Sequence, residues 1–350
     1  MLRLLSLLAW ILSTAVNGQR APPPYRQQDD SRPPSGLPTR IVQQFPPSIW
    51  IENMAVRSNG NLILNQLRPS AAVIQVTDPS SPYSYYEVAA IFPSIDGLYG
   101  ITEVSEDVFV VVGCRFATIG DNVKGSAETW MVNFKSTDRS GGPLVKRVGR
   151  HPYMEFPNGI TSLPGVDDVV LIADSTLGLV WRLYLETGVT EVAVQVREMA
   201  YRQGTRLKIG INGIKINDGY LWWSNSYVGE LYRLRIDRLG NPERNARPEL
   251  MYRHRGRFID DFALDDRGVW GTTNQNNTVL FAAYGGRVSD VAGKQTGLEL
   301  AVDTSCAFGR GARDGEILYV ATGNDAKRGL GGKVVAVDTT SVRPRGNYFN

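Results

Sequence analysis

The stretch NGITSLPGVDDVVLIADSTLGLVWRL, residues 158–183, decides the fold of this 350-residue chain. It opens with the small and polar group Asn158-Gly159-Ile160-Thr161, and two runs rich in valine, leucine and isoleucine follow at residues 169–172 and 180–183. β-Branched residues favour strands, and the glycine and aspartate residues between the runs favour turns. The stretch therefore predicts short antiparallel strands joined by tight connections.

Openings of the same kind recur five more times along the chain. They are Glu52-Asn53-Met54-Ala55, Tyr99-Gly100-Ile101-Thr102, Asn212-Gly213-Ile214-Lys215, Asp260-Asp261-Phe262-Ala263 and Thr304-Ser305-Cys306-Ala307. Successive openings lie 44 to 59 residues apart, as their first positions 52, 99, 158, 212, 260 and 304 show. That spacing fits four short strands and their loops per repeat. The sequence predicts an all-β, six-bladed β-propeller of four-stranded antiparallel blades.

The two ends of the chain differ from the repeats. Residues 1–18 contain Arg3, an apolar run at 4–12 and small residues up to Gly18, which is typical of a cleaved secretory signal peptide. Residues 19–47 hold eight prolines, which predict an extended lead-in, with globular structure beginning near Ile41. We expect a single propeller domain over residues 48–340, a tail at 341–350, and entry of the chain into the secretory pathway.

Composition limits the partners of the chain. The net charge is +3 with scattered Lys and Arg, which argues against nucleic-acid binding, and beyond the leader no apolar run approaches the ~20 residues needed for membrane insertion. Cys114 and Cys306 are the two cysteines, and we expect both thiols to be free. The sequon Asn276-Asn277-Thr278 predicts N-glycosylation of Asn276 on a surface turn. The oligomeric state stays open.

Propeller topology predicts where polar side chains gather. The innermost strand of a blade begins at the face where its hairpin partner ends, so starts and second-strand ends should surround one mouth of the central channel. The starts contribute Glu52, Tyr99, Asn158, Asn212, Asp260 and Thr304, and the ends contribute Asn65, Cys114, Asp174, Asn225, Asn274 and Thr322. We expect the functional site at this mouth.

Oxygen-bearing side chains at the mouth suit a hard cation. Glu52, Asn212 and Asp260 are candidate ligands for Ca²⁺ or another divalent cation. The alternative is that Asn and Asp before glycine serve the turn by bonding their own backbone. Transition-metal chemistry is not expected, because His151 and His254 fall outside the mouth and are interpreted as ordinary loop residues.

Further residues are candidates for catalysis or substrate contact. Lys215 replaces a small residue, and either donates to a developing oxyanion in the channel or pairs with a carboxylate. Tyr99 is a candidate hydrogen-bond donor, and Asp174 or Asp260 is the candidate general base for hydrolysis. The candidate substrate-binding residues are Asn158, Phe156, Trp222, Trp223, Tyr227 and Asn274.

Across residues 51–338 the chain resembles the senescence-marker-protein and gluconolactonase-like six-bladed propellers. The resemblance implies that Glu52, Asn212 and Asp260 hold a divalent cation while Asn158 touches substrate. The chain departs from that family at two positions. Phe156 stands where characterised lactonases have an arginine, two residues before the substrate asparagine, and Asp260-Asp261 replaces the fifth-blade Asp-Gly pair.

Residues 50–61, 171–181, 210–218 and 260–265 resemble more closely a fungal exported branch of this superfamily. Some of its members are hetero-Diels-Alderases that join a tropolone-derived o-quinone methide to humulene without a redox cofactor. The resemblance implies apolar or aromatic small-molecule substrates and no required cofactor. A cation-dependent lactonase and a non-catalytic binding propeller are the alternatives. Phe156 favours the pericyclase, whereas the complete Glu-Asn-Asp set favours the lactonase.

Overall fold

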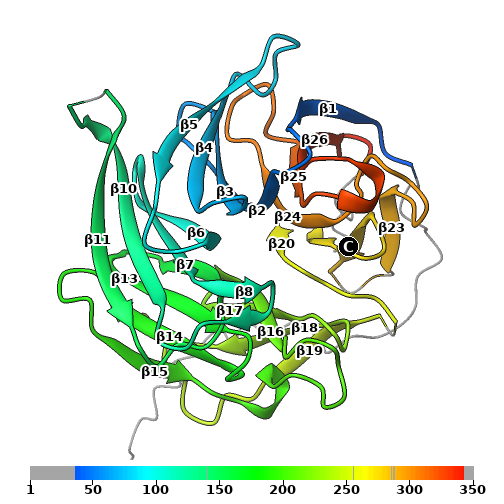
Figure 1. Ribbon diagram of the computed structural model, residues 1–350. Helices are drawn as coiled ribbons and strands as arrows, with labels where there is room; N and C mark the ends of the chain where they lie inside the picture. Colours follow the sequence, from blue (N-terminus) through cyan, green and yellow to red (C-terminus); the bar gives the residue numbers. More distant parts are fainter. Residues whose placement is uncertain (1–35, 140, 255, 285, 287, 343–350) are drawn as a thin grey trace, which may run out of the picture.

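Six four-stranded antiparallel sheets follow one another around a ring in the computed structural model (Figure 1). The structure describes residues 36–342 except 140, 255, 285 and 287, so the expected signal peptide and most of the expected tail lie outside the described residues. Each of the six openings found in the sequence lies in, or directly before, the innermost strand of one sheet. The predicted six-bladed β-propeller is confirmed.

The strands occupy equivalent places in the six blades. From blade 1 to blade 6 the innermost strands are β2 (Trp50–Val56), β6 (Gly97–Ser105), β12 (Pro157–Leu163), β16 (Ile211–Asn217), β20 (Phe262–Leu264) and β24 (Asp303–Phe308). The second strands are β3 (Leu62–Arg68), β7 (Val108–Cys114), β13 (Val166–Asp174), β17 (Tyr220–Asn225), β21 (Gly268–Thr272) and β25 (Ile317–Thr322). The third strands are β4 (Ala72–Thr77), β10 (Ala127–Thr137), β14 (Leu179–Tyr184), β18 (Glu230–Arg235), β22 (Thr278–Ala283) and β26 (Lys333–Asp338).

The outermost strands show how the ring closes. Blades 1 to 5 end with β5 (Tyr85–Ile91), β11 (Pro143–His151), β15 (Thr190–Val194), β19 (Glu249–Arg253) and β23 (Val288–Gly293), whereas blade 6 ends with β1 (Thr39–Gln44). β1 pairs antiparallel with β26, so the propeller begins earlier than the expected residue 48. The prolines at 38, 46 and 47 flank β1 and leave its ladder intact, which is why the proline-rich segment still supplies a strand.

The hydrophobic core consists of six clusters, each lying between two neighbouring blades. Successive side chains of a strand point to opposite faces of the sheet. In β3, for example, Leu62 and Leu64 join the cluster shared with blade 6, while Ile63 joins the cluster shared with blade 2. Every blade is therefore buried on both faces, which explains why its central strands read as continuous apolar runs.

Glycines after the opening asparagines allow the innermost strands to approach one another. A Cβ atom on Gly159 would lie 2.5 Å from the carbonyl oxygen of Asn212, and one on Gly213 would lie 2.2 Å from Oδ1 of Asp261. Contacts this short exclude any side chain. The glycines of the two Asn-Gly pairs are thus required by crowding at the axis, independently of what the asparagines bind.

Two insertions cover part of the mouth. The short hairpin of β8 (Phe116–Thr118) and β9 (Asp121–Asn122) lies between β7 and β10, and a loop with the 3₁₀ helix η1 (Arg197–Met199) precedes β16. A Cβ atom at Gly120, in the hairpin turn, would lie 2.8 Å from Leu207, so the two insertions touch.

A second 3₁₀ helix, η2 (Ala326–Arg328), precedes β26. Within residues 36–342 as described, no helix has the length and apolar character to cross a membrane.

Candidate functional site

The mouth of the channel brings several of the expected residues together. Asn212 Nδ2 donates a hydrogen bond to Asp260 Oδ1 at 2.6 Å, and Asn274 Nδ2 donates to Asp260 Oδ2 at 2.7 Å. Trp50 Nε1 donates to Glu52 Oε2 at 2.8 Å. These side chains come from blades 1, 4 and 5, which topology gathers at one face. We call Glu52, Asn212, Asp260 and Asn274 the polar half of the mouth.

Burial sets the protonation of the two carboxyl groups in the polar half. Loss of water raises the pKa of Asp260 well above its usual range, and the nearby charge of Glu52 adds to this effect. Burial likewise raises the pKa of Glu52 to about 7, against a lowering by the Trp50 indole. Near neutral pH this site therefore holds carboxyl groups that can carry protons.

The fit of a cation to these residues is limited by their hydrogen bonds. In the described part of the chain, no group of three or more His, Cys, Asp or Glu side chains is placed to hold a metal ion. Both oxygens of Asp260 already accept amide hydrogen bonds, and Glu52 accepts one from Trp50. This arrangement is a hydrogen-bond network, and the assignment of Glu52, Asn212 and Asp260 as cation ligands stays a prediction.

Lys215 pairs with a carboxylate, which was one of its two expected roles. Its Nζ lies 2.7 Å from Oδ1 and 3.0 Å from Oδ2 of Asp261, whose side chain is 4% exposed. Asp261 occupies the space that the missing side chain of Gly213 leaves free. The ion pair explains why blade 4 has a lysine where other blades have a small residue, and why a second aspartate follows Asp260 in blade 5. A donor role for Lys215 toward substrate is not supported by this geometry.

Asp174 holds a turn and is sealed from the channel. Its carboxylate accepts hydrogen bonds from the backbone N–H groups of Glu155, Phe156 and Leu177, and from the Trp181 indole. The residue is fully buried. A general base must reach the proton that it abstracts, and this carboxylate cannot reach substrate. Asp174 is therefore a structural residue in this arrangement, contrary to the expected role.

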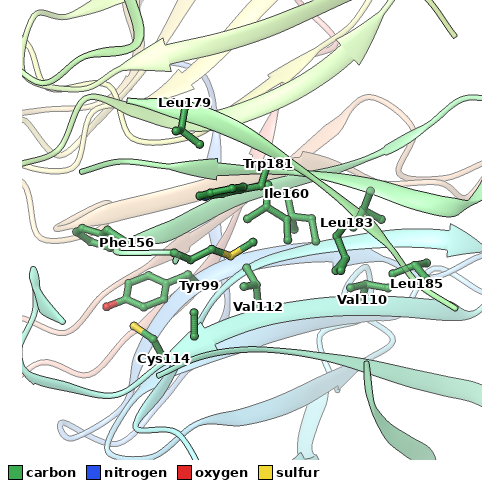
Figure 2. Packing of buried hydrophobic residues seen from close by; sticks show 14 of the residues in the cluster. Tyr99, Val110, Val112, Cys114, Phe156, Ile160, Leu179, Trp181, Leu183 and Leu185 are labelled. Atoms are coloured by element: carbon green, nitrogen blue, oxygen red, sulfur yellow. The ribbon is translucent and has the colours of Figure 1, made fainter. Parts of the chain in front are cut away.

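The apolar half of the mouth, on the side of blades 2 to 4, is defined here as Tyr99, Phe116, Phe156, Leu207 and Tyr227. All five belong to, or pack against, one buried cluster. Figure 2 shows Tyr99 beside Phe156, with the thiol of Cys114 near the tyrosine hydroxyl. The Tyr99 ring packs in T-shaped geometry against two neighbours, with ring centroids 5.2 Å apart for Phe156 and 6.3 Å apart for Phe116. These aromatic side chains form one continuous wall.

Tyr99 and Asn158 lie at the mouth, with their polar atoms engaged. The Tyr99 hydroxyl donates to Asn122 Oδ1 at 3.3 Å under the β8–β9 hairpin. Burial raises the pKa of this phenol well above its usual value, so the hydroxyl keeps its proton. Asn158 Nδ2 donates to Ser175 Oγ at 3.2 Å. Substrate contact by either residue stays a prediction.

Contrary to the expectation of substrate contact, neither of the two neighbouring tryptophans lines the mouth. Trp223 is fully buried between blades 3 and 4, where it stacks on Tyr232 at 5.4 Å. Trp222 faces blade 5 and lines a hollow of about 590 Å³ with Tyr220, Arg233 and Tyr284. That hollow lies where β16 ends and β17 begins, on the face opposite the mouth. Alternation along β17 directs both indoles between blades.

The cysteines and histidines have structural environments. Cys114 and Cys306 are buried and free, as predicted. His151 is the last residue of β11 and is buried, so its interpretation as a loop residue was wrong. Its Nε2 lies 2.8 Å from Thr129 Oγ1, and burial lowers its pKa to about 4. Asn276 lies in the turn between β21 and β22, and its glycosylation stays a prediction.

Arg68 was missed in the sequence. Because the second strand of blade 1 seemed to end at Asn65, the residues after it were not considered for the mouth. β3 extends to Arg68, which pairs across the sheet with Trp50. The Arg68 guanidinium lies 5.5 Å from the centroid of the Phe116 ring. An Arg-Pro pair closing an apolar strand was the available signal.

Comparison with known proteins identifies relatives over most of the chain. No protein-family model matches the chain. A Sarocladium schorii protein named as a hetero-Diels-Alderase is 33% identical over 83% of this chain and 79% of its own length. A Phoma protein of the same name is 33% identical over 82% of this chain and 87% of its own length.

Solved structures support the fold. The crystal structure of a calcium-binding regucalcin from Agrobacterium tumefaciens aligns with a TM-score of 0.59 at 14% identity. The alignment covers 90% of this chain and 99% of that chain. At this identity the likeness shows the propeller architecture and carries no conclusion about ligands or activity.

Proposed function

The chain belongs to the hetero-Diels-Alderase family, and from this premise we propose that it joins a tropolone-derived o-quinone methide to a humulene-type sesquiterpene. The observation that carries the proposal is the sequence likeness, which covers most of this chain and most of both relatives. The chemistry is enzymatic, and the proposed place for it is the mouth of the propeller.

The two halves of the mouth supply what this reaction needs. A cycloaddition is accelerated chiefly by holding diene and alkene in contact, which can contribute about 7–11 kcal/mol when orientation is good. The partly exposed side chains of Phe116, Leu207 and Tyr227, which pack against buried Tyr99 and Phe156, suit two apolar reactants. A polar residue is needed only where the substrate carries oxygen.

The polar half suits the step before the cycloaddition. An o-quinone methide forms when a hydroxyl group leaves as water, and that departure needs a proton. Glu52 is half-buried at the mouth and has a pKa raised to about 7 by burial, so it is protonated in a large fraction of molecules near neutral pH. We assign to Glu52 the role of general acid for this dehydration.

The experiment is to incubate the purified chain with a hydroxymethyl tropolone precursor and humulene, and to follow products by mass spectrometry. The expected adduct has the summed mass of both reactants less one water, and forms with a single stereochemistry. Heat-unfolded protein is the control, because quinone methides also react spontaneously. Adduct formation no faster than in that control, with mixed stereochemistry, contradicts the proposal.

The clustering of Glu52, Asn212 and Asp260 favours a second candidate function, a cation-dependent lactonase. The same preparation is tested on an aldonolactone with Ca²⁺ and with a chelator. Hydrolysis that depends on the cation, in the absence of adduct formation, would replace the first proposal.

A further inference from the structure

Arg68 differs from the other buried arginines of the propeller. The side chains of Arg57, Arg182 and Arg233 are 6 to 12% exposed, and each is paired with an aspartate or glutamate. Arg68 is half-buried as well. Unlike those three arginines, its guanidinium makes neither an ion pair nor a hydrogen bond in the described part of the chain. Its Nε is buried without a partner.

The surroundings of Arg68 place its charge on the apolar half of the mouth. The guanidinium packs over Phe116, which belongs to the β8–β9 hairpin. It lies close enough to Tyr99 to oppose, in part, the effect of burial on that phenol. Its strand neighbour Leu67 contributes to the same cluster as Tyr99. Apart from Arg68, this wall is formed by aromatic and aliphatic groups.

The buried Nε–H of Arg68, which lacks a partner, is costly for the folded protein. A donor that loses its water on folding and finds no acceptor destabilises the folded state, and the loss is larger for a charged group. A ligand that accepts hydrogen bonds removes this cost on binding. The planar fork of arginine matches two oxygens held side by side, on one carbon as in a carboxylate or on adjacent carbons as in an α-hydroxyketone.

We propose that Arg68 binds the carbonyl oxygen of the heterodiene, and that the site selects planar substrates with two adjacent oxygen atoms. This inference rests on the proposed function for its catalytic part. In the cycloaddition one C–C bond and one C–O bond form, while three π bonds become one, and no atom or electron leaves. The N–H groups of Arg68 keep their protons and draw electron density from the carbonyl, which makes the diene more reactive toward an electron-rich alkene.

Binding can be tested without turnover. Tropolone is the probe, because it is planar and carries a carbonyl and a hydroxyl oxygen on adjacent carbons, and tropone, which lacks the hydroxyl, is the comparison. Titration calorimetry on the full chain should show tighter binding of tropolone than of tropone. We expect Arg68→Met to weaken tropolone binding by about 10- to 100-fold and to remove the preference, since the charge-assisted bonds are lost.

Two further variants keep the test decisive. Arg68→Lys retains the charge without the fork, and should weaken tropolone binding less than Arg68→Met while reducing the preference over tropone. Arg238→Met is the matched control, because Arg238 is an exposed arginine in the connection after β18, and it should bind tropolone as the unaltered chain does. Circular dichroism verifies that each variant is folded.

The outcomes separate this inference from the proposed function. Tropolone binding that is equal in Arg68→Met and the unaltered chain overturns the inference, and so does adduct formation at an undiminished rate in that variant. If binding depends on Arg68 but no variant or unaltered protein forms adduct, the oxygen-binding role stands and the proposed reaction fails.

Discussion

The two halves of the mouth differ in the hydrogen bonds that their buried carboxyl groups accept. Below the apolar half, Asp174 is fully buried but accepts three backbone hydrogen bonds and one from an indole. In the polar half, burial raises the pKa of Asp260 and the charge of Glu52 adds to this rise, against two amide hydrogen bonds that lower it. Hydrogen-bond partners, as well as depth, therefore distinguish a carboxylate that holds a turn from one that lies beside a second carboxyl group.

Among the variants that probe the two halves, removal of an aromatic side chain from the apolar half should change the free energy of unfolding most. Phe156 is 3% exposed and packs on Tyr99. We expect Phe156→Ala to lower the free energy of unfolding by about 3–5 kcal/mol, because a large cavity is left. Urea unfolding measures this change, and Phe156→Leu should cost less. An alanine variant as stable as the unaltered chain would show that the apolar half is not a packed wall.

The ring and its mouth could be predicted because repeats fix blade number and topology fixes which strand ends meet. The contribution of β1 could not, since prolines at 38, 46 and 47 concealed a strand whose partner lies almost 300 positions away. The tandem Trp222 and Trp223 showed alternation, but alternation does not reveal which face meets a neighbouring blade. The role of Asp174 depends on residues 155 and 156 folding back above it, and no local pattern encodes that contact.

A second variant, Asp174→Asn, tests the difference between the carboxylates of Asp174 and Asp260. Asp174→Asn replaces an oxygen acceptor with an amide nitrogen that cannot accept the hydrogen bonds donated to it. We expect a loss of about 2–3 kcal/mol in the free energy of unfolding, with adduct formation per folded molecule unchanged. Chemical denaturation and an activity assay on the same sample measure both quantities. Lost activity at full stability would instead assign Asp174 to the chemistry.

The smallest effect concerns pH and Glu52. The folded pKa of about 7 exceeds the usual 4.5, so the folded state binds more protons between these values. The contribution of Glu52 to stability is therefore fully present below pH 4.5 and is lost as the pH rises through about 7. The full shift corresponds to about 3 kcal/mol, and screening by water around the half-buried carboxyl reduces the expected decrease to roughly 2 kcal/mol. We expect a flatter profile for Glu52→Gln.

Denaturant unfolding at several pH values across the window checks this expectation. Trp50→Phe provides a second variant, because the lost indole hydrogen bond should move the upper end of the window to higher pH. A profile for Glu52→Gln that is identical to that of the unaltered chain would show that Glu52 titrates normally in the polar half.

The pairing of β1 with β26 also has a consequence for synthesis on the ribosome. The strand that is translated first must wait for the strand translated last, since Thr39 lies opposite Val337. Blade 1 can assemble while later blades are still being made, but blade 6 leaves a nascent chain with an open edge until its final strand emerges. Any protection against aggregation that the cell gives this protein is needed longest at that edge.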